Sequence, residues 1–127
     1  MKVKDIMSDT FYMVMPQDTL EKTLSIMETK KVNGLPVVDE NKMLVGFIVK
    51  ADIYRFLSTT GHYEACPVDW AMSKDVITAM ADESIREAAK RLRQHNIIGM
   101  PVVEQGRVIG LVSIENVVDY FLSEKER

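Results

Sequence analysis

The residues best suited to chemistry lie near the end of the chain, where a serine and an asparagine flank the expected start of a helix. Ser113 falls at the expected N-cap position, and Glu115 and Asn116 follow in the first helical turn. Free backbone N–H groups and the helix dipole favour negative charge at such a position. A hydroxyl and an amide placed there therefore indicate a candidate site for an anion.

A β-hairpin is expected to hold this pair in place. Residues 99–103 form a short apolar run containing Pro101, which suits the start or edge of a strand because proline lacks an N–H. Residues 107–112 form a second run rich in β-branched residues, and Gln105-Gly106 supplies the turn between them. The second strand therefore ends directly at Ser113.

The same arrangement occurs twice in the chain. Residues 33–39 match 98–104, and 44–48 match 108–112, at a shift of 65 residues that falls to 64 beyond the hairpin turn. The apolar positions, the Gly-x-Pro triplet and the second glycine all keep register. Further matched pairs are Val3 and Val68, Met7 and Met72, Ser8 and Ser73, Leu20 and Ile85, Leu24 and Ala89, and Met27 and Leu92. Two half-domains about a pseudo-two-fold axis are expected.

Each half is expected to run strand, helix, strand, strand, helix. The opening strands are predicted at residues 11–15 and 75–80. Asp18 is expected to cap the first long helix, with Glu21 completing a capping box, and Ser84 is expected to cap its counterpart. The predicted fold class is α+β, with the sheets of the two halves packed together and the helices outside.

Composition and charge exclude several classes of protein. The 127 residues suit one globular domain, with 46% hydrophobic and 28% charged residues. A net charge of −3 disfavours a free-standing nucleic-acid binder. No apolar run approaches the ~20 residues of a membrane span. The single Cys66 excludes an internal disulfide and fits a reducing cytoplasm. The sequence therefore predicts a cytoplasmic domain without a membrane or nucleic-acid partner.

No catalytic or metal-binding set stands out. A nucleophile with a base, a phosphate loop and a metal-ligand cluster are all missing from the pattern, and His62 and His95 stand alone. We therefore predict a protein that is not an enzyme, with no catalytic and no metal residues. Four basic side chains are expected on solvated faces, Lys30, Lys31, Arg91 and Arg93, with contact to a phosphate as the alternative for Lys31.

Taken together, these motifs resemble a tandem pair of CBS domains (named for cystathionine β-synthase), the assembly often called a Bateman module. The resemblance rests on the duplication and on an apolar-Pro-Val-Val strand at residues 35–38 and 100–103. It also rests on a Gly-apolar-apolar-x-x-x-Asp/Asn run at 46–52 and 110–116. Because the matches cover nearly the whole chain, we expect one CBS-pair domain over residues 1–127, with repeats at 1–61 and 62–127.

The resemblance implies a regulatory module. Such domains bind adenosine-containing ligands in two clefts between the repeats and regulate enzymes, transporters or channels without catalysis. The expected ligand is AMP, ADP, ATP, S-adenosylmethionine or an NAD-like relative, no cofactor is required, and the regulated partner is a separate protein. A homodimer through the helical faces is also expected, because the closing helices offer surplus apolar surface: Ile53, Phe56, Leu57, Val117, Val118, Tyr120 and Phe121.

The resemblance assigns a main nucleotide site to the second repeat. Ser113 takes the phosphate position, Asn116 the position at the ribose hydroxyls, and Thr78 the position near the adenine. Hydroxyl and amide groups have the donors and acceptors that these contacts need. Apolar walls for the base are expected from Ile77, Met80, Ile98, Met100 and Pro101, with backbone groups around Ile77 and Met100 reading its polar edge. The rim from the other repeat is expected to be Asn33, Gly34 and Leu35.

A second, weaker site is expected on the first repeat. Val49 occupies the position of Ser113 and Met13 that of Thr78, so both hydroxyls are lost. Asp52 keeps the ribose position, where a carboxylate accepts hydroxyl donors well, and Lys50 can meet the phosphate as a point charge. The other residues predicted for this site are Leu35, Pro36, Asn96, Ile98 and Gly99.

A structural role is the alternative for the same residues. Ser113 is a good N-cap in any protein, and Asn116 can satisfy backbone groups in the first turn. Asp52 is favoured near a helix N-terminus for electrostatic reasons alone. Gly46 and Gly110 are expected to mark close packing. Under this interpretation the chain is a structural or dimerisation module with vestigial nucleotide sites.

Overall fold

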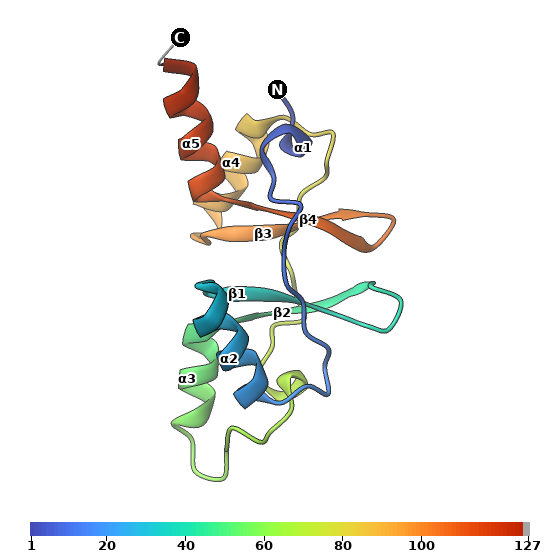
Figure 1. Ribbon diagram of the computed structural model, residues 1–127, viewed down its shortest axis with the longest axis vertical. Coiled ribbons are helices and arrows are strands. Elements are labelled where there is room, and N and C mark those ends of the chain that lie inside the picture. The colour runs from blue at the N-terminus through green and yellow to red at the C-terminus, as the bar shows by residue number, and fades with distance from the viewer. Residues whose placement is uncertain (126–127) are drawn as a thin grey trace. The chain divides into compact units, whose positions relative to one another are not determined.

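In the computed structural model, residues 1–125 are described, with side chains through residue 123 (Figure 1). The chain divides into two compact units. The continuous unit is Tyr12–Val76, and the split unit joins Met1–Phe11 to the chain from Ile77 onward. Each unit combines helices with one two-stranded antiparallel sheet, so the mixed α and β class predicted from the sequence is confirmed.

The continuous unit follows the order helix, strand, strand, helix. It contains α2 (Leu20–Lys30), β1 (Gly34–Val38), β2 (Leu44–Val49) and α3 (Lys50–Leu57), followed by the short 3-10 helix η1 (Val68–Trp70). Both long helices lie on one side of the β1–β2 hairpin (Figure 1). Its core consists of Val14, Leu20, Met27, Leu35, Val37, Ile48, Ile53 and Val68.

The split unit repeats this order. It contains α4 (Ile85–Gln94), β3 (Gly99–Glu104), β4 (Arg107–Ser113) and α5 (Ile114–Lys125), and the N-terminal helix α1 (Val3–Ile6) packs with them. The helices again lie on one side of the hairpin (Figure 1). Its core consists of Val3, Ala79, Ile85, Ala88, Leu92, Met100, Val102, Val112 and Val117.

The predicted opening strands, residues 11–15 and 75–80, are wrong in extent. Each is reduced to one bridging residue, Ala79 beside Val102 and Val14 at the equivalent place in the continuous unit. Ala79 N–H donates to the carbonyl of Pro101 at 2.9 Å. Toward Ile77 the parallel ladder stops there because its next bond would need an N–H from Pro101, which proline lacks.

Each sheet gains a further edge from a short segment. In the split unit, Ser8 exchanges two backbone hydrogen bonds with Leu111, of 2.8 and 3.0 Å. In the continuous unit, Ser73 does the same with Phe47, at 2.8 and 2.9 Å. The split unit therefore takes its edge from the N-terminal residues, whereas the continuous unit takes its edge from residues after α3. Each compact unit therefore contains the edge segment that belongs to the other sequence repeat.

The prediction of close packing at Gly46 and Gly110 is confirmed. A Cβ on Gly110 would lie 2.7 Å from the Met7 sulfur and 3.0 Å from the Ser8 carbonyl oxygen. A Cβ on Gly46 would lie 2.6 Å from the Met72 sulfur. Glycine therefore lets each edge segment approach its sheet.

The helix caps match the prediction at one helix and differ at the other. Ser84 caps α4, accepting a hydrogen bond from Glu87 N–H at 3.1 Å, as predicted. Asp18 does not cap α2, because Thr19 occupies the N-cap and accepts from Lys22 N–H at 3.1 Å. The Asp18 carboxylate instead accepts a hydrogen bond from a backbone N–H of the preceding loop and pairs with Lys22.

Candidate ligand-binding sites

In the split unit, the predicted site residues meet at one end of the sheet. Gly99, which begins β3, pairs with Ser113, which ends β4. The segment around Ala79 runs parallel to β3, so Thr78 lies toward the same end. Helix α5 begins there, directly after Ser113. The strand register therefore brings Thr78 and the start of α5 to one end of one sheet.

The two faces of this sheet differ in character. Ala79 and Met100 belong to the core, whereas Thr78 is half-buried and Met80 is 62% exposed. Pro101 is buried, although it alternates with core-facing neighbours. Because side chains alternate along a strand, Thr78, Met80 and Pro101 project from the face opposite the unit's own core. The Met100 side chain lies in the core, so it cannot form an apolar wall, and only its backbone is available to a ligand.

The other two predicted wall residues differ in exposure. Ile98 is 66% exposed, and its carbonyl accepts a hydrogen bond from Ile114 N–H at 2.9 Å. Ile77 is half-buried and packs against the core. Ile98 therefore presents apolar surface to solvent beside the start of α5.

Ser113 and Asn116 form a reciprocal cap at the start of α5. Asn116 N–H donates to Ser113 Oγ at 3.1 Å, and Ser113 N–H donates to Asn116 Oδ1 at 2.9 Å. The Ser113 hydroxyl also donates to Asn116 Oδ1, at 3.0 Å. The N-cap role, which is the structural alternative for Ser113, is therefore present, and it holds the hydroxyl and the amide next to each other.

This cap changes what an anion would meet at the start of α5. Of its first three N–H groups, that of Ile114 donates to Ile98 and that of Asn116 donates to Ser113. The expectation of free N–H groups is therefore wrong for two of these three, because a backbone carbonyl and a side-chain hydroxyl already accept from them. An oxygen of a ligand must share or replace the hydrogen bonds of the Ser113–Asn116 cap.

An ion pair secures the segment that carries Thr78. The Arg91 guanidinium makes two hydrogen bonds to the Glu83 carboxylate, of 2.8 and 3.0 Å, and a third to the Thr78 carbonyl at 3.1 Å. Glu83 also accepts from Met80 N–H at 2.7 Å. One guanidinium thereby ties both ends of the loop from 78 to 83 to helix α4.

The electrostatics of this pair favour its charged form. Burial raises the pKa of the Glu83 carboxyl, but hydrogen bonds from Arg91 and Met80 N–H, together with the Arg91 charge, outweigh burial. The pKa of Glu83 therefore lies below its ordinary value of 4.5. The hydrogen bond to Glu83 likewise raises the pKa of Arg91.

Sequence reasoning missed this ion pair, since Arg91 was predicted on a solvated face. The Arg91 side chain is only 31% exposed and that of Glu83 is 15% exposed. The available signal was a difference between the repeats, because the position equivalent to Arg91 is Ile26 in the first repeat. Where one repeat has an apolar residue and the other has an arginine at the equivalent position, the arginine indicates a polar contact that is specific to its repeat.

The continuous unit places its equivalents differently. Val49 is the N-cap of α3 and gives no side-chain hydrogen bond, and Lys50 N–H donates to the Asn33 carbonyl at 2.8 Å. The Asp52 carboxylate, half-buried, pairs with Arg55 on the next turn. Because Arg55 already holds this carboxylate, a ligand must compete for Asp52.

The remaining predicted residues fall into two classes by burial. Leu35 is 1% exposed and lies in the core of the continuous unit, so its side chain is not available to a ligand, and Pro36 is buried as well. The others keep exposed or half-buried side chains or backbone: Met13, Asn33 and Gly34 in the continuous unit, and Asn96 and Gly99 in the split unit.

The described part of the chain offers neither a metal-binding cluster nor a membrane-spanning helix. Among the described residues, no three His, Cys, Asp or Glu side chains are grouped so that they could hold a metal ion. None of the helices in this part of the chain is long and apolar enough to cross a bilayer.

A scan of protein families identifies the class of this protein. The model of the CBS domain matches twice, over residues 3–59 and 68–123. The chain therefore belongs to the CBS domain family, as the sequence motifs predicted.

Particular proteins with the same domain include enzymes and solved CBS pairs. The homoserine O-acetyltransferase of Methanococcus vannielii is 33% identical over 118 residues, which make up 92% of this chain and 24% of that protein. The chain thus spans only about a quarter of the length of the curated relatives it first matches.

Two of the structural neighbours were solved with adenosine-containing ligands. The CBS domain pair of protein MJ0100, in complex with methylthioadenosine and S-adenosyl-L-methionine, matches with a TM-score of 0.87 and 31% identity, covering 98% of both chains. CBSX2, a CBS-pair protein of Arabidopsis thaliana, was solved in complex with AMP. It matches with a TM-score of 0.89 and 27% identity, covering 98% of both chains.

Proposed function

We propose that this chain is a ligand-sensing regulatory module that binds an adenosine-containing small molecule. The single observation that carries the proposal is the Ser113–Asn116 cap at the end of the sheet where Thr78 also lies. The Ser113 hydroxyl meets a phosphate, Asn116 meets the ribose hydroxyls, and Thr78 lies near the base. The chain acts by binding and not by catalysis.

The chemistry of the site supports this ligand class. Hydroxyl and amide groups can exchange their mutual hydrogen bonds for bonds to a sugar-phosphate without leaving a buried group unsatisfied. Met80 and Ile98 are exposed apolar side chains of a kind that can cover an aromatic base. The complexes of the MJ0100 CBS pair and of CBSX2 support an adenosine compound in particular.

We propose that the two units bind unequally. Val49 and Met13 offer no hydrogen bond where the split unit has Ser113 and Thr78, and Asp52 is already paired with Arg55. The continuous unit therefore contributes a weaker site, in which Lys50 and Asp52 are the polar contacts. The rim assignments Asn33, Gly34, Leu35, Pro36, Asn96, Ile98 and Gly99 stay predictions.

The proposed biological role is control of a partner protein. The relative from Methanococcus vannielii carries a matching segment within a much longer enzyme, which supports an enzyme as the regulated partner. A homodimer remains our proposal for the state in which the module works, because α5 exposes Val118, Phe121 and Leu122 by 47–56%.

The test is isothermal titration of the purified protein with AMP, ADP, ATP and S-adenosylmethionine. We expect heat of binding for at least one of them, with a tighter and a weaker class of sites. No heat and no competition for any of the four would contradict the proposal and favour the alternative, a structural module with vestigial sites.

A further inference from the structure

The segment around Ala79 is fixed at four successive backbone groups. Ala79 makes two backbone hydrogen bonds to β3, of 2.9 and 3.0 Å. On one side of it, the Thr78 carbonyl accepts from Arg91 at 3.1 Å. On the other side, Met80 N–H donates to Glu83 at 2.7 Å. Because Arg91 and Glu83 are themselves joined by two hydrogen bonds, they form a single clamp over this segment.

The continuous unit has only half of this clamp. The carboxylate equivalent to Glu83 is that of Asp18, which also accepts a hydrogen bond from the preceding loop, at 2.8 Å. Its other oxygen, however, pairs with Lys22 on α2, and Ile26 stands at the position of Arg91. Within the described part of the chain, only the split unit therefore has a clamp that reaches the backbone carbonyl before the bridging residue.

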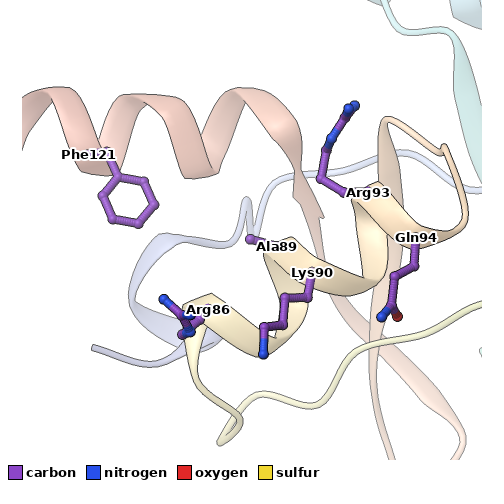
Figure 2. A pocket seen from close by; sticks show the side chains of 6 residues that line it. All are labelled: Arg86, Ala89, Lys90, Arg93, Gln94 and Phe121. Atoms are coloured by element: carbon purple, nitrogen blue, oxygen red, sulfur yellow. The ribbon is translucent and has the colours of Figure 1, made fainter.

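Arg91 also differs from the other two arginines of α4. Arg86 and Arg93 are exposed and line an open groove between α4 and α5 (Figure 2). The residues of this α4–α5 groove are Arg86, Ala89, Lys90, Arg93, Gln94 and Phe121. Arg91 does not line it, and its side chain is only 31% exposed, beside a Glu83 side chain that is 15% exposed. Its guanidinium therefore makes charge-assisted hydrogen bonds that are partly shielded from water, and these are among the stronger ones in proteins.

We propose that Arg91 is a positioning residue for ligand binding in the split unit. It holds Thr78 in the conformation that the ligand meets, and it acts through Thr78 and Glu83 without touching the ligand. This inference rests on the proposed function, because it requires the adenosine compound to lie beside Thr78. A segment that is ordered in advance binds more tightly, since binding does not have to order it. The clamp thus gives the split unit a second advantage over the continuous unit, besides its two hydroxyls.

Affinity separates a positioning role from a merely structural one. As long as a variant stays folded, a loss of global stability leaves its dissociation constant unchanged, because nearly all molecules can still bind. A loss of positioning raises the apparent dissociation constant, which is the intrinsic constant divided by the fraction of molecules that are competent to bind. The measurement therefore belongs at a temperature well below unfolding.

Isothermal titration with AMP, ADP, ATP and S-adenosylmethionine tests the positioning role. Arg91→Met removes all three hydrogen bonds of the guanidinium. It is expected to weaken the tighter class of sites about tenfold, the change expected if the segment is then competent about one tenth of the time. Arg93→Met is the matched control, because it removes an exposed arginine from the same helix, and it should leave affinity unchanged. Circular dichroism confirms that each variant is folded.

A double variant shows whether the two side chains of the clamp act as a unit. Glu83→Gln should weaken binding in the same direction as Arg91→Met, because the neutral amide leaves one donor of Arg91 without its acceptor. Arg91→Met with Glu83→Gln should bind no more weakly than Arg91→Met alone, since the clamp is already open. Additive losses would overturn the clamp.

The titrations distinguish this inference from the proposed function. If wild type binds a ligand and Arg91→Met binds it equally well, the positioning role is overturned and the proposed function stands. If wild type binds none of the four ligands, both are overturned.

Hydrogen exchange of the ligand-free protein gives a second readout. In Arg91→Met, the amides of residues 77–83 should exchange faster than in wild type, while those of β4 keep the wild-type rate within about twofold. Faster exchange spread evenly over the split unit would show a loss of stability in place of a loss of positioning, and would overturn the inference.

Discussion

At the scale of single residues, the candidate site combines a structural use and a proposed functional use of the same side chains. Ser113 and Asn116 cap α5 through three mutual hydrogen bonds, and the same atoms are the ones proposed to contact a sugar-phosphate. Without ligand, the cap satisfies these groups and holds them in place. We propose that binding exchanges hydrogen bonds within this small cluster.

Substituting Ser113 separates the two uses. Ser113→Val should weaken binding of a phosphate-bearing ligand by about 1.5–3 kcal/mol, the size of a hydrogen bond to a charged group. It should also destabilise the protein by about 1 kcal/mol through loss of the cap. Isothermal titration and thermal unfolding measure the two effects.

Ser84→Ala is the matched control, because Ser84 caps α4 in the same way but is not a predicted contact. It should lower stability by about 1 kcal/mol and leave affinity unchanged. If both variants bind equally well, Ser113 is a cap and nothing more.

The Glu83–Arg91 pair should make stability depend on pH in a defined window. Because the pKa of Glu83 is lowered in the folded state, its contribution is complete above the ordinary value of 4.5. The contribution is lost as the pH falls through the lowered value. Thermal unfolding from about pH 7 to about pH 3 should therefore show a larger acid loss for wild type than for Glu83→Gln. An equal loss of stability in wild type and in Glu83→Gln would show that Glu83 does not contribute to the acid sensitivity.

At the scale of elements, the sequence was informative wherever both repeats carry the same signal. Both hairpins, the Ser84 cap and the two packing glycines were predicted because turns, caps and small residues leave local patterns. The proline in each first hairpin strand also limits the opening strand on its N-terminal side, but that consequence appears only once the ladder is known. The Arg91 contact could not be predicted, since it joins residues that no local pattern links.

Glycine at the edge of each sheet provides an element-scale prediction. Gly110→Ala would place a Cβ 2.7 Å from the Met7 sulfur and 3.0 Å from a backbone oxygen. Displacing the edge segment should destabilise the protein by about 1–3 kcal/mol. Denaturant unfolding measures the change.

Gly99→Ala is the control on the neighbouring strand, where the nearest atom would be 3.5 Å from the new Cβ, an ordinary contact. It should change stability by less than about 1 kcal/mol. An equal loss of stability in both variants would mean that the close approach of the edge segment is not the reason for a glycine at position 110.

At the scale of the whole molecule, the exchange of edge segments places the first residues of the chain in the same compact unit as the second sequence repeat. Val3 is fully buried in the core of the split unit, and Val68 is fully buried in that of the continuous unit. The sequence repeat shows that Val3 and Val68 are equivalent, but it cannot show which of the two sheets each one packs against. That information lies in the chain path, which the sequence pattern does not encode.

Matched core substitutions test this path. Val3→Ala should destabilise the split unit by about 2 kcal/mol and speed hydrogen exchange in β3 and β4 before β1 and β2. Val68→Ala should show the reverse order. Equal acceleration in both sheets for both variants would contradict the assignment of each edge segment to one unit.

The central claim is that the start of α5 is a binding site for an adenosine compound, and an amide NMR titration with AMP and with S-adenosylmethionine tests it most directly. The account predicts the largest shifts at Thr78 and from Ser113 to Asn116, saturating with ligand, and smaller shifts at Lys50 and Asp52. Spectra that stay unchanged with both ligands, or shifts confined to the α4–α5 groove, would contradict it.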